Sequence, residues 1–139
     1  MSNSKFSVVL TIVLPLLATT AAAHHSFAAY DTSKTITVQA TIREFDWGAP
    51  HSSGSFMILQ PDGQVKVVSL VAGAPNSFSS QGFHAHDFKP GIKVTLIYHP
   101  LRTGSTSGGS LAGIVFPDGR KYGDTGPGSS GASPTGSSH

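Results

Sequence analysis

The sequence predicts an all-β fold, a small five-stranded OB-like barrel with one short helix between strands 3 and 4. Five segments alternate apolar and polar residues with the period of two that is typical of half-buried strands. Pro- and Gly-containing turns separate several of them. The segment between the third and fourth strands breaks the alternation, and strand, hairpin, short helix, hairpin is the order of an OB-like barrel. A small β-sandwich is the alternative.

Residues 1–23 have the three parts of a cleavable export signal. Lys5 provides a positive start, residues 8–17 are apolar, and three alanines at 21–23 offer the small residues that cleavage requires. An uncleaved membrane anchor needs roughly 20 apolar residues, and a proline and two threonines interrupt this stretch. We expect cleavage at its end, which exposes His24, or one residue earlier. The mature protein is then periplasmic or secreted.

The first predicted strand occupies residues 35–43. Its buried face consists of four apolar residues at alternate positions, Ile36, Val38, Ala40 and Ile42. Residues 55–71 follow as a hairpin around a Pro-Asp-Gly turn. The apolar positions of that hairpin are Phe56, Ile58, Val65, Val67 and Leu70.

The second half of the chain begins with a short helix. Asn76 is predicted to cap it, and it ends near Gly82. A Lys-Pro-Gly turn then leads into residues 92–98, which show the cleanest alternation of the sequence. Residues 111–116 are the last predicted strand, closed by a second Pro-Asp-Gly turn.

Composition limits the size and class of the protein. The barrel domain is predicted at residues 24–122, and the Gly/Ser/Thr/Pro-rich residues 123–139 form a disordered tail. The 139-residue chain has a net charge of only +2 and no Lys/Arg cluster, which argues against a nucleic-acid partner. It has no cysteine, so disulfides, thiolate metal sites and cysteine nucleophiles are excluded.

Two histidines stand where the mature chain is expected to begin. The α-amino group and imidazole of a terminal His24 can chelate a metal together, and His25 adds a second imidazole. Cleavage one residue earlier makes His24 the second residue and His25 the third, which suits a square-planar site. Both arrangements favour Cu(II) or Ni(II). His51 is the candidate for a third imidazole, if the N-terminal arm folds back. The alternative is a pair of solvated histidines on a frayed terminus.

Other candidate residues have more ordinary interpretations. On an extended segment, the side chains of His84 and His86 face the same side, and Asp87 can accept a hydrogen bond that orients one of them. The favoured interpretation is that both are solvated histidines of a loop. Phe45 and Trp47 can form a stacking platform for a sugar, although the barrel core is the favoured place for them.

No set of residues predicts an enzyme. The Gly-Ser-Thr-Ser-Gly sequence at 104–108 matches a nucleophile elbow, which requires a strand before it and a helix after it, whereas this segment is a Gly/Ser loop. Glu44 is the only glutamate, which argues against a hydrolase with paired carboxylates.

Several short motifs resemble a family of small exported bacterial proteins of uncharacterised function. They are His24-His25-Ser26-Phe27-Ala28 with Asp31, Trp47 with Pro50-His51, Gly73-Ala74-Pro75-Asn76, Gly82, Lys89-Pro90-Gly91, Pro100 with Gly104, and Asp118-Gly119-Arg120-Lys121. The resemblance runs from His24 to about Tyr122 and implies a small OB-like barrel. Members carry asparagine at the position of Ala49 and a glutamate near that of Val71, so roles of those two residues do not carry over.

Our first hypothesis is therefore a periplasmic copper-binding protein that uses His24, His25 and His51. The alternative is a non-catalytic binding module for a small molecule, an oligosaccharide or a partner protein, with no metal. An oxidative copper enzyme with an N-terminal histidine ligand is a distant third, because the domain is small for a large substrate surface. We expect no nucleic-acid partner and, after signal cleavage, no membrane association.

Overall fold

The computed structural model describes residues 27–125. Its strands are β1 (Ile36–Asp46), β2 (Ser53–Leu59), β3 (Val65–Val71), β4 (Lys93–Pro100), β5 (Gly108–Val115) and β6 (Lys121–Gly123). A short helix, α1 (Pro75–Ser79), lies between β3 and β4, and 3-10 turns occur at Phe27–Ala29 and Ala85–Asp87.

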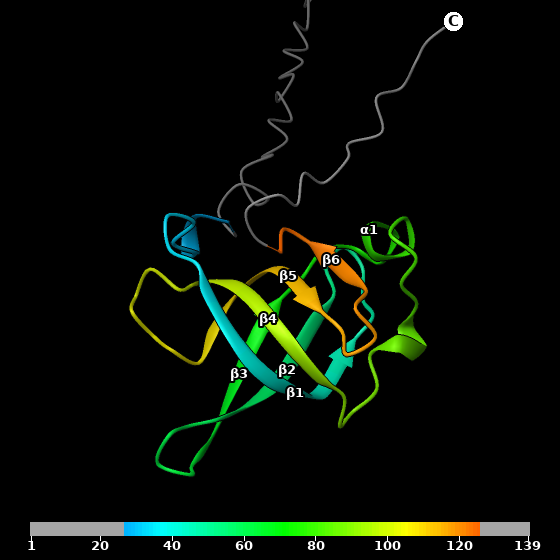
Figure 1. Ribbon diagram of the computed structural model, residues 1–139. Coiled ribbons are helices and arrows are strands. Elements are labelled where there is room, and N and C mark those ends of the chain that lie inside the picture. Colours follow the sequence, from blue (N-terminus) through cyan, green and yellow to red (C-terminus); the bar gives the residue numbers. More distant parts are fainter. Residues whose placement is uncertain (1–26, 126–139) are drawn as a thin grey trace, which may run out of the picture.

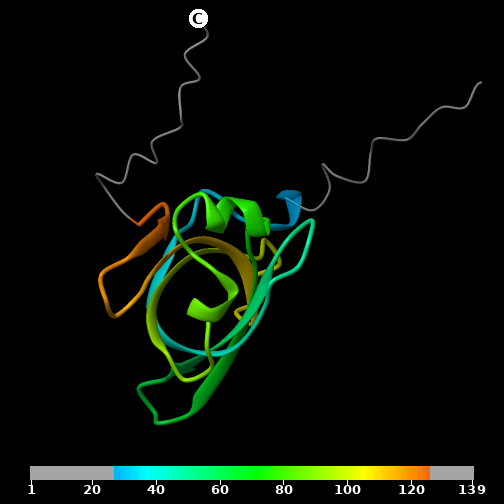
Figure 2. The same ribbon diagram turned by 90° about the vertical axis from the view of Figure 1, so that its right-hand side faces the viewer.

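The strands form a closed barrel, as predicted. Their order is β3-β2-β1-β4-β5-β6, and each neighbouring pair is antiparallel. A parallel pairing of β3 with β5, between Ser69–Val71 and Gly108–Ser110, closes the ring (Figure 1). Viewed along the barrel, the strands surround a common interior (Figure 2). This strand order, with a helix between the third and fourth strands, confirms the OB-like barrel and not the sandwich.

The longest strand, β1, takes part in two seams of the barrel. Its first half pairs with β4, from Ile36 opposite Tyr98 to Thr41 opposite Lys93, and its second half pairs with β2. The pairing with β2 shifts register between Ile42 and Glu44. An irregularity of this kind bends a strand, which allows one strand to serve both sides of a small barrel.

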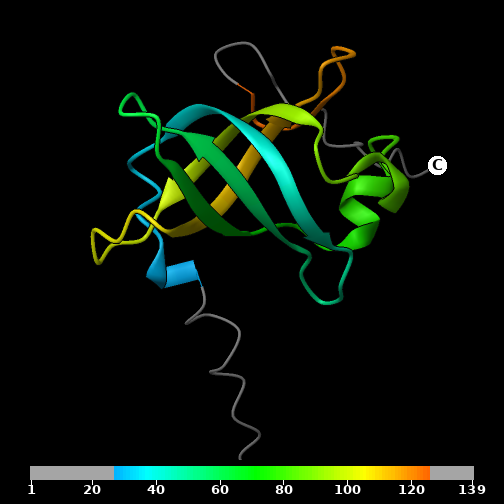
Figure 3. The ribbon, with the colours of Figure 1, turned by 90° about the horizontal axis from the view of Figure 1, so that it is seen from below.

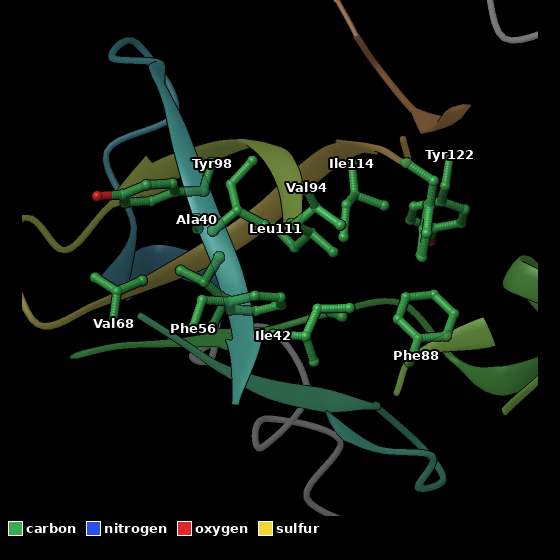
Figure 4. Packing of buried hydrophobic residues seen from close by; sticks show 14 of the residues in the cluster. Ala40, Ile42, Phe56, Val68, Phe88, Val94, Tyr98, Leu111, Ile114 and Tyr122 are labelled. Atoms are coloured by element: carbon green, nitrogen blue, oxygen red, sulfur yellow. The ribbon is translucent and has the colours of Figure 1, made fainter. Parts of the chain in front are cut away.

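The interior is filled by side chains from alternate strand positions, as Figure 4 shows for the central part of the core. In β1 the alternation gives the predicted inward face, with Ala40 and Ile42 buried. In β3 Leu70 is buried as expected, but Val65 is 59% exposed and Val68 is buried in place of the expected Val67. The pairing with β2 explains this: Val68 lies opposite the buried Phe56.

The segment between β3 and β4 covers one end of the barrel, and Figures 2 and 3 show it lying across that end. Phe78 of α1 is completely buried there, and so is Phe83. The predicted cap was wrong by two residues: the N-cap is Ala74, whose methyl side chain cannot make a cap bond, and Pro75 occupies the first turn.

Strand β6 was not among the predicted strands. It is an edge strand paired only with the end of β5, and Tyr122 is its one buried residue. The Asp124 N–H continues the contact by donating to the Ala112 carbonyl at 2.9 Å. Most of the predicted tail, residues 126–139, lies outside the described residues.

Candidate functional site

The N-terminal part of the described chain is fixed to the segment where β4 ends. The Asp31 N–H donates to the Pro100 carbonyl at 2.8 Å, and the next contact is an isolated bridge between Tyr30 and Leu101. Arg102 then closes the 27–29 turn: its backbone N–H donates to the Ala29 carbonyl and its Nε–H to the Ala28 carbonyl, both at 2.9 Å.

The predicted ligands His24 and His25 lie outside the described residues.

His51 lies at the other end of β1. It is exposed, in the loop between β1 and β2, directly after a cis Ala49–Pro50 peptide. This loop is held next to the helical end of the barrel, because the Ser52 N–H donates to the Gly73 carbonyl at 3.0 Å. In Figures 1 and 3 the 27–29 turn and this loop lie at opposite ends of the barrel. The structure thus does not bring His51 near the anchored turn.

His84 and His86 lie on the surface beside a short ion-pair chain. Their rings are stacked with centroids 5.5 Å apart. The carboxylate of Asp87 accepts hydrogen bonds from the His84 backbone N–H at 2.8 Å and from Arg120 at 2.9 Å. Arg120 also bonds Asp118 at 2.8 Å. The Arg120 hydrogen bond, together with that of the His84 N–H, lowers the pKa of Asp87 to about 2.

The Asp-Gly-Arg-Lys motif therefore has a structural role at this point. The guanidinium of Arg120 lies 5.1 Å from the centre of the Phe83 ring and 5.8 Å from that of Phe116. Both rings belong to the buried core. Arg120 thereby links the segment between β3 and β4 to the turn before β6. Asp87 therefore orients Arg120 and not the rings of His84 and His86.

The aromatic residues at this end form a packed cluster, as the favoured interpretation predicted. Phe45 stacks on Phe88 with centroids 4.1 Å apart, and Trp47 lies 5.4 Å from Phe78. Phe45 and Trp47 are partly buried and pack against the core. Phe45 and Trp47 therefore help to close this end of the barrel by packing against the core.

A cleft of about 440 Å³ lies on the outer face of β4, on the side where β1 begins and β6 ends. Ile97 and Ala112 supply its apolar lining, and three threonines contribute to its polar part. His99 and Asp124 are its titratable groups. The sequence alone gives no reason to select His99, because only its neighbours in the fold bring it to this cleft.

A second, smaller recess of about 280 Å³ lies on the outside of β1, β2 and β3. Glu44 and Asp46 contribute carboxylates to it, and three serines contribute hydroxyl groups. Within residues 27–125, however, no three His, Cys, Asp or Glu side chains are close enough to hold a metal ion together. The helices among these residues also include none that is long and apolar enough to cross a membrane.

Comparison with known proteins gives a family and no function. Residues 13–110 match the model of DUF6152, a family of unknown function. The match confirms that the chain resembles an uncharacterised family, and it covers the barrel as far as the start of β5. No curated protein and no solved structure matches the chain.

Proposed function

We propose that this chain, which belongs to the DUF6152 family, is an exported protein that binds copper(II) at its mature N-terminus. Signal cleavage before His24 frees an α-amino group, and this amine and the His24 imidazole chelate the ion. His25 supplies a further imidazole. Two or three nitrogen ligands of this kind suit Cu(II), because this ion prefers tetragonal coordination by nitrogen. The bound ion is carried or buffered, because no substrate-activating residues accompany these ligands in the sequence.

The observation that supports this proposal is the anchoring of the turn that follows the two histidines. Hydrogen bonds from Asp31 and Arg102 hold residues 28–31 against the end of β4. A metal site two residues from a fixed turn loses less conformational freedom on binding than one at the end of a long free arm. The barrel then acts as a support that presents the terminus at a defined place.

We favour His25 over His51 as the additional ligand. An 11-residue strand, β1, separates the N-terminal turn from the loop of His51. A straight strand of that length spans about 33 Å at roughly 3.3 Å per residue, which is an upper bound because β1 bends. The arm from Phe27 to His24 reaches only about 11 Å, even when fully extended. If His51 binds copper, it therefore does so apart from the terminal site.

The test uses protein whose intact mass proves that it begins at His24. Cu(II) titration is followed by competition with a chelator, and electron paramagnetic resonance reports nitrogen ligation. We expect the H24A/H25A double variant to lose at least tenfold in affinity, about 1.4 kcal/mol, and H51A to bind like the wild type. A form with three glycines before His24 is the matched control, because it moves the terminal amine away from both imidazoles and places neither histidine third from the terminus.

Two results would contradict the proposal. One is an unchanged affinity after replacement of both terminal histidines, and the other is an intact mass that places the mature start beyond His25. A loss of affinity in H51A alone would reassign the site to the β1–β2 loop.

A further inference from the structure

The edge of β3 that faces away from β2 is only partly covered in the closed barrel. The seam with β5 involves Ser69–Val71 of β3 and no earlier residue of that strand. The first half of β3 belongs to the β2–β3 hairpin, which reaches beyond the rest of the barrel in Figures 1 and 3. This half of the strand is therefore a short exposed edge.

The register of the hairpin shows which backbone groups face this edge. The Ser69 N–H points away from β2, because it donates to the Ser107 carbonyl at 2.9 Å. The direction of the backbone groups alternates along an antiparallel strand, so the N–H and C=O groups of Val65 and Val67 also point away from β2. Within residues 27–125 these groups have no hydrogen-bond partner. They are open to an added strand.

Apolar side chains lie beside these open backbone groups. Val65 is 59% exposed, and Leu59, opposite it on β2, is 73% exposed. Met57 and Val67 are the next pair on the same face, so the four side chains form an apolar strip on the outside of the hairpin. An added strand places every second side chain along this strip, which favours apolar residues at those positions.

Lys66 determines which kind of strand fits between the two valines. In the part of the chain that the structure describes, no carboxylate forms an ion pair with it. Two copies of this chain that pair about a two-fold axis at Lys66 use all the open groups of Val65 and Val67. The two lysines then lie directly opposite each other, which is unfavourable. An acidic residue of a different chain forms a cross-strand ion pair there instead, so the charge favours another protein over a second copy.

We infer that β3 binds a short extended segment of a partner protein by antiparallel strand pairing. The segment has an acidic residue opposite Lys66 and an apolar residue on each side of it. Its backbone bonds the open groups of Val65 and Val67, and its apolar side chains extend the strip on the outside of the hairpin. This site lies within the described barrel and does not involve the N-terminal histidines, so the copper proposal is tested separately.

The test is a titration of the ¹⁵N-labelled protein with the capped peptide Thr-Val-Glu-Val-Thr. We expect saturable shifts of the Val65 and Val67 amides and slower exchange of their hydrogens with water, because new hydrogen bonds protect them. A peptide with lysine in place of glutamate should bind about tenfold more weakly, because like charges then lie opposite each other. A peptide that is N-methylated at both valines keeps the charge but loses the two donors, and we expect no saturable shifts with it.

Charge variants of the protein separate strand pairing from general attraction. Lys66→Glu should reverse the preference, so that the lysine peptide binds more tightly than the glutamate peptide. Lys121→Glu is the matched control, because it makes the same change in net charge at an exposed position of the edge strand β6. That variant should leave both affinities within about twofold, since solvent screens a distant surface charge.

Three outcomes would overturn the inference. In the first, the amides of Val65 and Val67 gain no protection at any peptide concentration. In the second, the glutamate, lysine and N-methylated peptides bind alike, which would show apolar contact without strand pairing. In the third, the same amides become protected as the protein concentration rises without peptide, which would assign this edge to a second copy of the chain.

Discussion

Replacing Asp87 by asparagine tests the ion pair that fixes the covering segment of the barrel. The fall in the pKa of Asp87 from the ordinary 3.8 to about 2 corresponds to about 2 kcal/mol of stabilisation. The Asp87 side chain is 11% exposed and its partner Arg120 is 44% exposed. Solvent screens such a pair, so we expect Asp87→Asn to cost about 1 kcal/mol at pH 7, or roughly 5 °C in Tm for a domain of this size.

The same variant makes a prediction about pH. A carboxyl group whose folded pKa lies below its unfolded pKa stabilises the protein above the unfolded value, and that contribution is lost as the pH falls through the folded value. The difference in unfolding free energy between wild type and Asp87→Asn should therefore be complete above about pH 5 and shrink between pH 4 and pH 2.

Urea unfolding at pH 7, 4, 3 and 2, followed by tryptophan fluorescence of Trp47, measures this difference. Asp118→Asn is the matched control, because Asp118 also bonds Arg120 but is 53% exposed. We expect that control to change stability clearly less than Asp87→Asn does at pH 7, because solvent screens the exposed pair. Equal stability of wild type and Asp87→Asn at pH 7, or a difference that stays constant down to pH 2, would refute the reasoning.

Two further predictions concern the barrel end and the N-terminal turn. Phe78→Ala should lower the free energy of unfolding by about 3–5 kcal/mol in urea titrations, because the side chain is completely buried; Leu59→Ala, at a 73% exposed position, should change it by less than about 0.5 kcal/mol. Arg102→Ala removes the bond to the Ala28 carbonyl. It should lower the NMR order parameters of residues 27–29 while changing global stability by less than about 1 kcal/mol, and unchanged order parameters would show that the backbone contacts suffice.

The alternation of apolar residues was sufficient to find the five barrel strands, because each strand buries one face in the same core. It was not sufficient to orient β3, where valines occupy three of the first four positions and either face looks buried. Only the pairing with β2 decides between them. Strand β6 escaped detection because three residues are too few to show a period, and only Tyr122 anchors it.

The roles of residues in the candidate sites were harder to predict than the strands, because they depend on contacts between residues that are far apart in the sequence. The sequence places His99 next to a proline, and nothing in its neighbours shows that the Lys34 carbonyl fixes its ring. Arg120 likewise lies 33 positions from Asp87 along the chain. The N-terminal histidines are the opposite case, because their interest comes from local sequence and from a cleavage event, and their placement lies outside the described residues.

The way the barrel is closed has a consequence for how the chain folds. Three of its five seams join strands that follow one another, but the β1–β4 seam joins Ile36 to Tyr98 and the last seam joins β3 to β5. A growing chain can form the early hairpin alone, yet the ring stays open until residues near 110 are available. Loop-closure entropy must be overcome before these distant pairings contribute, so we expect cooperative and comparatively slow folding, on the millisecond-to-second scale. Fragments that stop before β5 should remain unable to complete the core.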